Sequence, residues 1–171
     1  MGKSNYLKYF QKNLRDSIEN LICKQWGYSE ILVLEEDGVM PGKFNGFMDI
    51  SIYNPSNENN VIGIEIEHIS DYYQARKNII KLKEWTHYSS KRSSGLLHIF
   101  NETCNITPDN IGELIKYAKE NEHKNHGFYY DFVFYKVENQ TKTKQNPEEI
   151  VNSMDFKARL WMLIENSGLL E

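Results

Sequence analysis

Three carboxylates lie close together in the sequence, in two strand-like segments. Asp49 is in the first segment, and Glu65 and Glu67 are in the second, Gly63-Ile64-Glu65-Ile66-Glu67-His68. Apolar and acidic residues alternate there, so the two glutamates are predicted to share one face of a strand and the isoleucines the other. Partly buried carboxylates repel each other, and Mg²⁺, Mn²⁺ or Ca²⁺ is a usual compensator. The pattern predicts a metal site, and the alternative is an ordinary solvent-exposed edge of a sheet.

The segments around these carboxylates predict a helix followed by three strands. Asn5–Trp26 has apolar residues three and four positions apart, which predicts a helix that ends at Gly27. A polar turn over Asn54–Asn60 separates the last two strands. The strands are expected to form an antiparallel meander over Glu30–Glu36, Phe44–Tyr53 and Val61–His68.

A helix and a buried strand are predicted next. Asp71–Trp85 has an amphipathic pattern, with Ser70 or Asp71 as the candidate cap. Gly95–Phe100 is a short apolar run, typical of a buried parallel strand that the helix joins to the third strand as a crossover. Three further elements are expected as peripheral additions: a helix over Pro108–Glu122, a strand over Gly127–Val137 and a helix over Pro147–Glu165.

The acidic motif resembles that of the PD-(D/E)XK (restriction endonuclease-like) nuclease superfamily. In that superfamily an Asp on one strand precedes D/E-x-K on the next, as Asp49 precedes Glu65-Ile66-Glu67 here. Glu67 stands where the family has its Lys, and Met48 where it usually has Pro; some Type II restriction endonucleases are similar in carrying E-x-E. The resemblance covers about Asn5–Asn101. It implies an α/β fold with a mixed sheet, a core order of helix, three-strand meander, helix and strand, and helices on both faces.

The resemblance and the chemistry of phosphodiester hydrolysis assign roles to the motif. Asp49 and Glu65 are expected to be the principal ligands of Mg²⁺, for which Mn²⁺ could substitute, and the backbone carbonyl of Ile66 is a third candidate. Glu67 is expected either to complete a two-metal site or to act as the general base on the attacking water. These two alternatives stay open at the level of sequence.

A cation is still required, because Glu67 cannot do the electrostatic work of a Lys on a phosphate oxygen. Lys77 and Lys81 on the following helix are the candidates to reach back to the site, as catalytic and substrate-binding residues. Gln74, one turn earlier, could hydrogen-bond a phosphate or a metal-bound water. Acids on the first helix often join the metal site of this superfamily through water, which makes Glu19 a further candidate; its alternative is a solvated helix residue.

Length and composition agree with one domain over residues 1–171, with a core at about 5–101 and additions at about 102–171. The 171 residues are 40% hydrophobic and 13% aromatic, enough to bury a sizeable core. No apolar run of membrane-spanning length and no signal-peptide pattern is present, which predicts a cytoplasmic protein without a membrane partner. Cys23 and Cys104 are too few for a disulfide framework and are expected to be free thiols.

The formal net charge of −4 has to be reconciled with a polyanionic partner. An acidic metal centre beside a basic rim would allow this, and basic residues do follow the acidic strand. They are Arg76, Lys77, Lys81, Lys83, Lys91 and Arg92. The sequence therefore predicts a metal-dependent nuclease that hydrolyses phosphodiester bonds of nucleic acid, with DNA the expected partner. The alternative is a non-catalytic nuclease-fold domain that acts as a binding or interaction module, and the choice between monomer and homodimer stays open.

Overall fold

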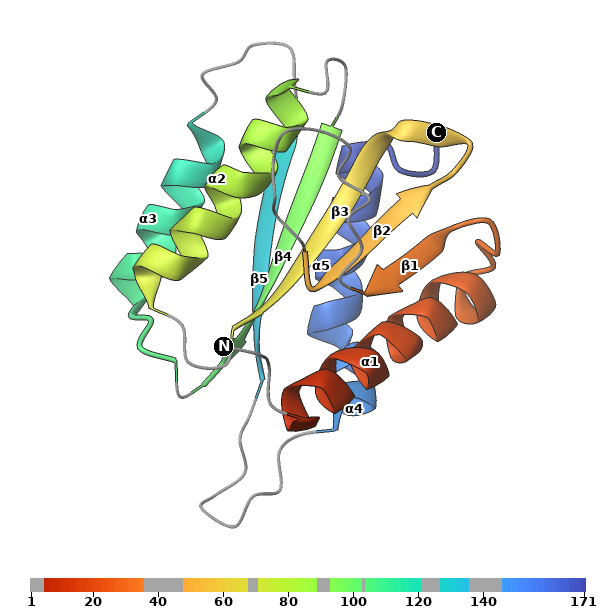
Figure 1. Ribbon diagram of the computed structural model, residues 1–171, viewed down its shortest axis with the longest axis horizontal. Coiled ribbons are helices and arrows are strands. Elements are labelled where there is room, and N and C mark those ends of the chain that lie inside the picture. Colours follow the sequence, from red (N-terminus) through yellow and green to blue (C-terminus); the bar gives the residue numbers. More distant parts are fainter. Residues whose placement is uncertain are drawn as a thin grey trace.

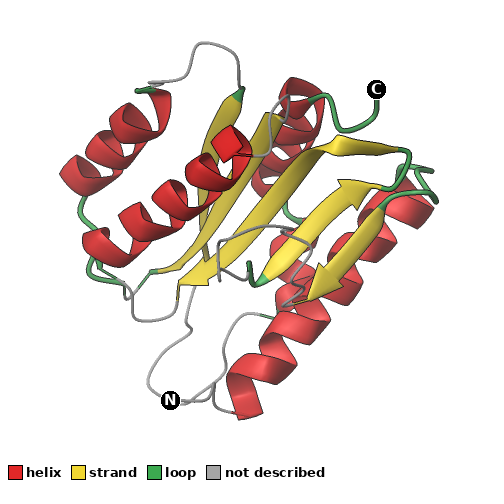
Figure 2. Cartoon of the chain, turned by 45° about the horizontal axis from the view of Figure 1, so that its top comes forward, coloured by secondary structure: helices red, strands yellow, loops and turns green. Residues whose placement is uncertain are grey.

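The computed structural model describes residues 5–35, 48–67, 71–88, 93–102, 104–120, 127–135 and 146–171. Within these ranges a five-stranded mixed sheet is covered by helices on both faces, as Figures 1 and 2 show from two directions. The predicted α/β fold with helices on both faces of a mixed sheet is therefore confirmed.

The strands lie in the sheet in the same order as in the sequence. They are β1 (Leu32–Glu35), β2 (Ile50–Asn54), β3 (Asn57–Glu67), β4 (Ser93–Asn101) and β5 (Phe128–Tyr135). The first three pair antiparallel, which is the predicted meander, and β4 pairs parallel to β3. The crossover between β3 and β4 contains the predicted helix, because parallel neighbours need a long connection.

Each face of the sheet has its own helices and its own apolar core. On one face lie α1 (Asn5–Glu19), α4 (Pro147–Asn152) and α5 (Met154–Ser167), and on the other lie α2 (Tyr72–Tyr88) and α3 (Pro108–Lys119). Ile64 and Ile66 of β3 belong to the core under α1 and α5. Since side chains alternate along a strand, Glu65 and Glu67 face α2, which confirms the predicted alternation.

The end of the first helix agrees with the prediction, and the turn between β2 and β3 is shorter than predicted. The first helix ends as expected before Gly27, which has a positive φ of 84°, but its last turn, Asn20–Gln25, is π-helical. The polar turn predicted over Asn54–Asn60 is too long: only Pro55 and Ser56 form the turn, and β3 begins at Asn57. The Asn54 side chain accepts a hydrogen bond from the Ser56 N–H, which closes the hairpin after two residues.

The prediction that the C-terminal elements are peripheral is wrong. β5 pairs parallel to β4 within the same sheet. Helix α5 packs on β3, β4 and β5 and contributes Phe156, Leu160 and Leu163 to the core that it shares with α1. The reason is geometric: β4 is buried along almost its whole length, so it needs a strand at its free edge and a helix over each face.

Parts of the sequence-based predictions lie outside the described residues. They include the end of the first predicted strand at Glu36, the start of the second, Phe44–Phe47, and the end of the third at His68. The ends of the predicted C-terminal helix (121–122) and strand (136–137) and the basic residues Lys91 and Arg92 also lie outside. Among the helices that the structure describes, none has both the length and the apolar character that crossing a bilayer requires.

Candidate metal centre and its polar surroundings

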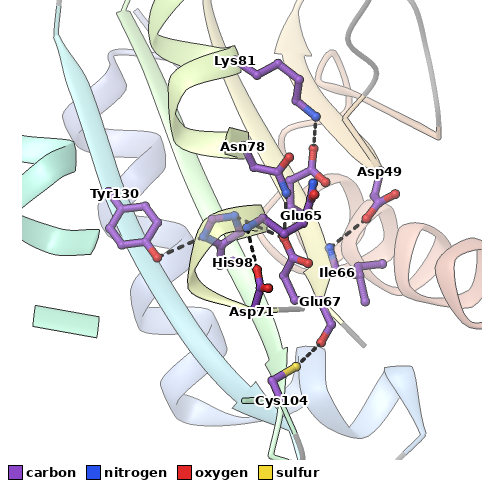
Figure 3. A network of polar contacts seen from close by, with 11 residues as sticks. Asp49, Glu65, Ile66, Glu67, Asp71, Asn78, Lys81, His98, Cys104 and Tyr130 are labelled. Atoms are coloured by element: carbon purple, nitrogen blue, oxygen red, sulfur yellow. Dashed lines mark hydrogen bonds and ion pairs between the residues drawn. The ribbon is translucent and has the colours of Figure 1, made fainter. Parts of the chain in front are cut away.

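The three carboxylates of the motif come together at the edge where β2 begins and β3 ends. Asp49 directly precedes β2, and the antiparallel register pairs Ile50 with Ile64, so Asp49 stands opposite Glu65 when the register is continued. Glu65 and Glu67 are both buried, with 7% and 4% of their surface exposed. Figure 3 shows the three side chains together below α2.

Asp49 is fixed to the neighbouring strand and to the first helix. Its Oδ2 accepts a hydrogen bond of 2.8 Å from the backbone N–H of Ile66. Its backbone carbonyl accepts a hydrogen bond of 2.8 Å from Nε2 of Gln11, a buried residue of α1. In a strand the N–H and C=O of one residue point to the same side. The Ile66 carbonyl is therefore directed toward the Asp49 side of β3, where a third oxygen ligand was predicted.

Lys81 reaches the motif from α2, on the other face of the sheet from α1. Its Nζ lies 2.6 Å from Oε1 of Glu65, and 21% of the Lys81 side chain is exposed against 9% for Glu65. The ammonium group thus lies where the buried carboxylates meet solvent. Lys81 thus brings an ammonium group from α2 to the acidic pair on β3.

Glu67 is held by groups that the sequence analysis did not select. Asn78, one turn before Lys81 on α2, donates a hydrogen bond of 2.7 Å from Nδ2 to Oε1 of Glu67. The thiol of Cys104 donates to the Glu67 backbone carbonyl at 2.8 Å. Cys23 and Cys104 are both free thiols, as predicted. Of the two, Cys104 lies beside the acidic motif.

Burial and mutual repulsion raise the pKa values of both glutamates. The pKa of Glu65 rises from 4.5 to about 8, first because burial disfavours the charged form and then because Asp49 is close, while Lys81 opposes the change. The pKa of Glu67 rises from 4.5 to about 7, mainly through burial, with the Asn78 hydrogen bond opposing it. The site therefore concentrates carboxylates whose ionised forms are destabilised by their surroundings.

A buried histidine completes the group on the β4 side. His98 is fully buried, and its Nε2 lies 3.7 Å from Oε1 of Glu67. Its Nδ1 lies 3.0 Å from the hydroxyl oxygen of Tyr130 on β5. Burial lowers the pKa of His98 from 6.5 to about 3, and the neighbouring Lys81 lowers it further in the same direction, so the ring is neutral.

The remaining predicted side chains are exposed. Gln74 and Lys77 are exposed on α2, on the solvent side of the helix that carries Lys81. Glu19 is not brought to the motif: it is exposed and pairs with Arg15 at 2.9 Å, about 12 Å along α1 from Gln11. The first-helix residue that reaches Asp49 is Gln11, on the buried face of α1.

Two of the residues missed from sequence carried a weak signal. His98 is the one ionisable residue in the apolar run Gly95–Phe100, and Asn78 interrupts the apolar pattern of the buried face of α2. A polar residue at a buried position needs a partner: Asn78 donates to Glu67, and Nδ1 of His98 lies beside the Tyr130 hydroxyl. The identity of that partner could be read only from the fold.

In the part of the chain that the structure describes, no three histidine, cysteine or acidic side chains form a ready-made metal cluster. The carboxylate oxygens are instead engaged by the Ile66 N–H, Lys81 and Asn78. The donor set itself is hard: carboxylates and a backbone carbonyl are the ligands that Mg²⁺ and Mn²⁺ prefer. The residues thus fit such an ion in the kind of ligand atoms that they offer.

Comparisons with known proteins give one structural likeness. Neither models of protein families nor curated proteins match this sequence. Among solved structures, the SfsA protein of Pyrococcus furiosus in complex with Ca²⁺ matches with a TM-score of 0.43 and 12% identity, over 82% of this chain and 60% of that one. The chain therefore spans less than two thirds of SfsA. A likeness this distant is no basis for assigning an activity, so the site has to be judged on its own geometry.

Proposed function

We propose that this chain is a metal-dependent nuclease that hydrolyses phosphodiester bonds of nucleic acid, with DNA the expected substrate. Asp49 and Glu65 are the principal ligands of Mg²⁺ or Mn²⁺, and the Ile66 carbonyl is the third. The observation that supports this most is the convergence of Asp49, Glu65 and Lys81 from three separate elements. A solvated sheet edge, the alternative interpretation of the motif, would leave the glutamates exposed, and both are buried.

The electrostatics of the glutamates support a cation at this place. Burial and the proximity of Asp49 disfavour the ionised form of Glu65, and one lysine only partly offsets this. A bound divalent ion supplies positive charge for the phosphate and lowers the pKa of a water molecule. Protein groups must then orient the diester and handle protons around it.

Lys81 has the position for contact with the substrate. Its ammonium group is at the border between buried carboxylates and solvent, so a phosphate oxygen can approach it from outside. Positive charge placed where the transition state gains negative charge is worth about 10²–10³ in rate in comparable sites. Lys77, one turn earlier and exposed, and Gln74 would contact the backbone of the nucleic acid farther from the reacting phosphate.

Glu67 serves either as a ligand of a second ion or as the general base. Asn78 holds its Oε1, which fixes the carboxylate direction in both cases. A base is most effective when its pKa is near the working pH, and burial brings the pKa of Glu67 to about 7. A second ion would instead keep Glu67 ionised throughout.

A non-catalytic binding module is the second candidate, because the Lys81–Glu65 ion pair is also what a purely structural site would contain. The two candidates differ in metal binding. A nuclease should bind Mn²⁺ in calorimetry and nick or cut nucleic acid only with a divalent cation, and Asp49→Ala should abolish both.

The assay uses duplex DNA, single-stranded DNA and RNA with Mg²⁺, with Mn²⁺ and with EDTA. Glu165→Gln, which changes an exposed carboxylate of α5, is the matched control and should behave as the wild type. Wild-type protein that binds neither Mn²⁺ nor any of these substrates at low salt would contradict the proposal and favour the binding module.

A further inference from the structure

His98, which is fully buried, and Tyr130, which is partly buried, form a pair that the proposed chemistry has not yet used. They come from the two parallel strands β4 and β5, whereas the proposed metal ligands lie on β3 and directly before β2. His98 pairs with Glu65 in the β3–β4 register and projects on the same face, so its ring lies beside Glu67. Figure 3 shows the row from Tyr130 through His98 to the glutamates.

The Nε2 atom of His98 is the unusual feature of this row. Among the residues that the structure describes, it has no hydrogen-bond partner although it is fully buried. The atom that it faces, Oε1 of Glu67, is 3.7 Å away, about 0.8 Å beyond the usual N–H···O distance of 2.9 Å. A buried polar atom without a partner is costly, so its position beside a carboxylate calls for a reason.

The hydroxyl of Tyr130 decides which nitrogen of His98 carries the proton. A neutral imidazole has one N–H and one lone pair. If Tyr130 donates to Nδ1, the proton is on Nε2 and its N–H points at Glu67. The opposite tautomer would direct a bare lone pair at the carboxylate, which is repulsive once Glu67 is ionised. Burial keeps the Tyr130 phenol protonated, since it raises its pKa far above the usual 10, and a phenol is a good donor.

We propose that His98, with its tautomer fixed by Tyr130, is a positioning residue that directs the Glu67 carboxylate toward the metal centre. This rests on the proposed function and deepens it, because it gives Glu67 two supports on the same oxygen, Asn78 from α2 and His98 from β4. Outer groups of this kind orient metal ligands, and their loss usually costs about 10–100-fold in metal affinity.

The first test is ¹⁵N nuclear magnetic resonance of the histidine side chains in the EDTA-treated protein. The wild type should show the Nε2–H tautomer of His98. Tyr130→Phe, which keeps the ring and removes the hydroxyl, should lose this preference. Tyr129→Phe is the matched control, because Tyr129 is the preceding residue of β5 and packs against the core of the opposite face. An Nδ1–H tautomer in the wild type would overturn the proposal.

The second test is calorimetric titration with Mn²⁺ alone, together with the melting temperature of each variant. Tyr130→Phe should lower Mn²⁺ affinity about 10-fold or more with little change in melting temperature. His98→Gln, whose amide can still donate toward Glu67, should retain more affinity than His98→Leu. Wild-type affinity in Tyr130→Phe would overturn the positioning role and leave the nuclease proposal intact. Absence of Mn²⁺ binding in the wild type would overturn the metal centre itself, while the tautomer still shows whether Tyr130 fixes His98.

Discussion

Replacing Glu65 with Gln should stabilise the metal-free protein, although it removes a proposed metal ligand. The folded-state pKa of Glu65 is about 8, against a usual value of 4.5. Between these two pH values the folded protein keeps a proton that the unfolded chain has released, so the free energy of unfolding falls as pH rises through this window. Below about 4.5 the group contributes no such loss. Gln cannot ionise, so the free energy of unfolding of the variant does not fall in this way as pH rises.

The size of the effect follows from the width of the window. At about 1.36 kcal/mol for each pH unit, the upper limit is about 5 kcal/mol at pH 8. The gradual titration of Glu67 reduces this, and we expect a gain of about 3 kcal/mol, which for a chain of this length raises Tm by about 6–12 °C. The ion pair with Lys81 is a small loss, because that side chain is partly exposed and an amide oxygen can still accept from it.

The assay is thermal unfolding in EDTA at pH 5 and pH 8. Glu65→Gln should be more stable than the wild type at pH 8 and nearly equal to it at pH 5, and the exposed control Glu165→Gln should stay within about 0.5 kcal/mol at both. Adding Mn²⁺ at 100 times its Kd should stabilise the wild type by about 2.7 kcal/mol and the variant much less. A Glu65→Gln protein that is less stable than the wild type at pH 8 in EDTA would refute the reasoning, because burial of this carboxylate would then not lower the free energy of unfolding.

Four further outcomes are expected. Lys81→Met should lower the cleavage rate about 10²–10³-fold, whereas Lys77→Met should mainly reduce the salt dependence of duplex binding, by about 0.9 in the slope of log affinity against log salt; equal effects on cleavage would contradict the placement of the two side chains. Glu67→Ala should cost about 10²–10⁴ in rate, and Glu67→Lys should be as inactive in plasmid nicking, since a lysine is already at the site; an active Glu67→Lys would mean that Glu67 merely replaces the family's Lys. Glu19→Gln should leave the Mn²⁺ affinity unchanged in calorimetry, because its carboxylate pairs with another part of α1. Gly27→Ala should lower the free energy of unfolding by about 1 kcal/mol in chemical denaturation, because φ is 84° there.

The sequence alone determined the features that depend on local periodicity. The alternation in β3 placed Glu65 and Glu67 on one face, and the apolar run Gly95–Phe100 of β4, in which His98 is the one ionisable residue, predicted a buried strand. Gly27 marked the end of the first helix, because few other residues adopt a positive φ. Each of these depends on neighbours a few residues away, and such neighbours are visible in the sequence.

The tertiary structure decided which distant residues meet the carboxylates. Asn78, His98 and Gln11 are 11 to 38 positions away from the acidic residues that they support or anchor, and no local pattern pairs them. The same holds for β5 and α5, which are distant in sequence from β3 and yet complete its sheet and its core.

The choice between the two candidate lysines shows the physical reason. Lys77 and Lys81 are four residues apart on one side of α2, so the sequence treats them alike. Packing of Ala75, Ile79 and Leu82 on the sheet fixes the rotation of α2 and its position along β3. At that position Lys81 lies over Glu65, whereas Lys77, about 6 Å along the axis, faces solvent. A helical period specifies which side chains share a face, but only the packing of the helix on its sheet decides which of them reaches a given carboxylate.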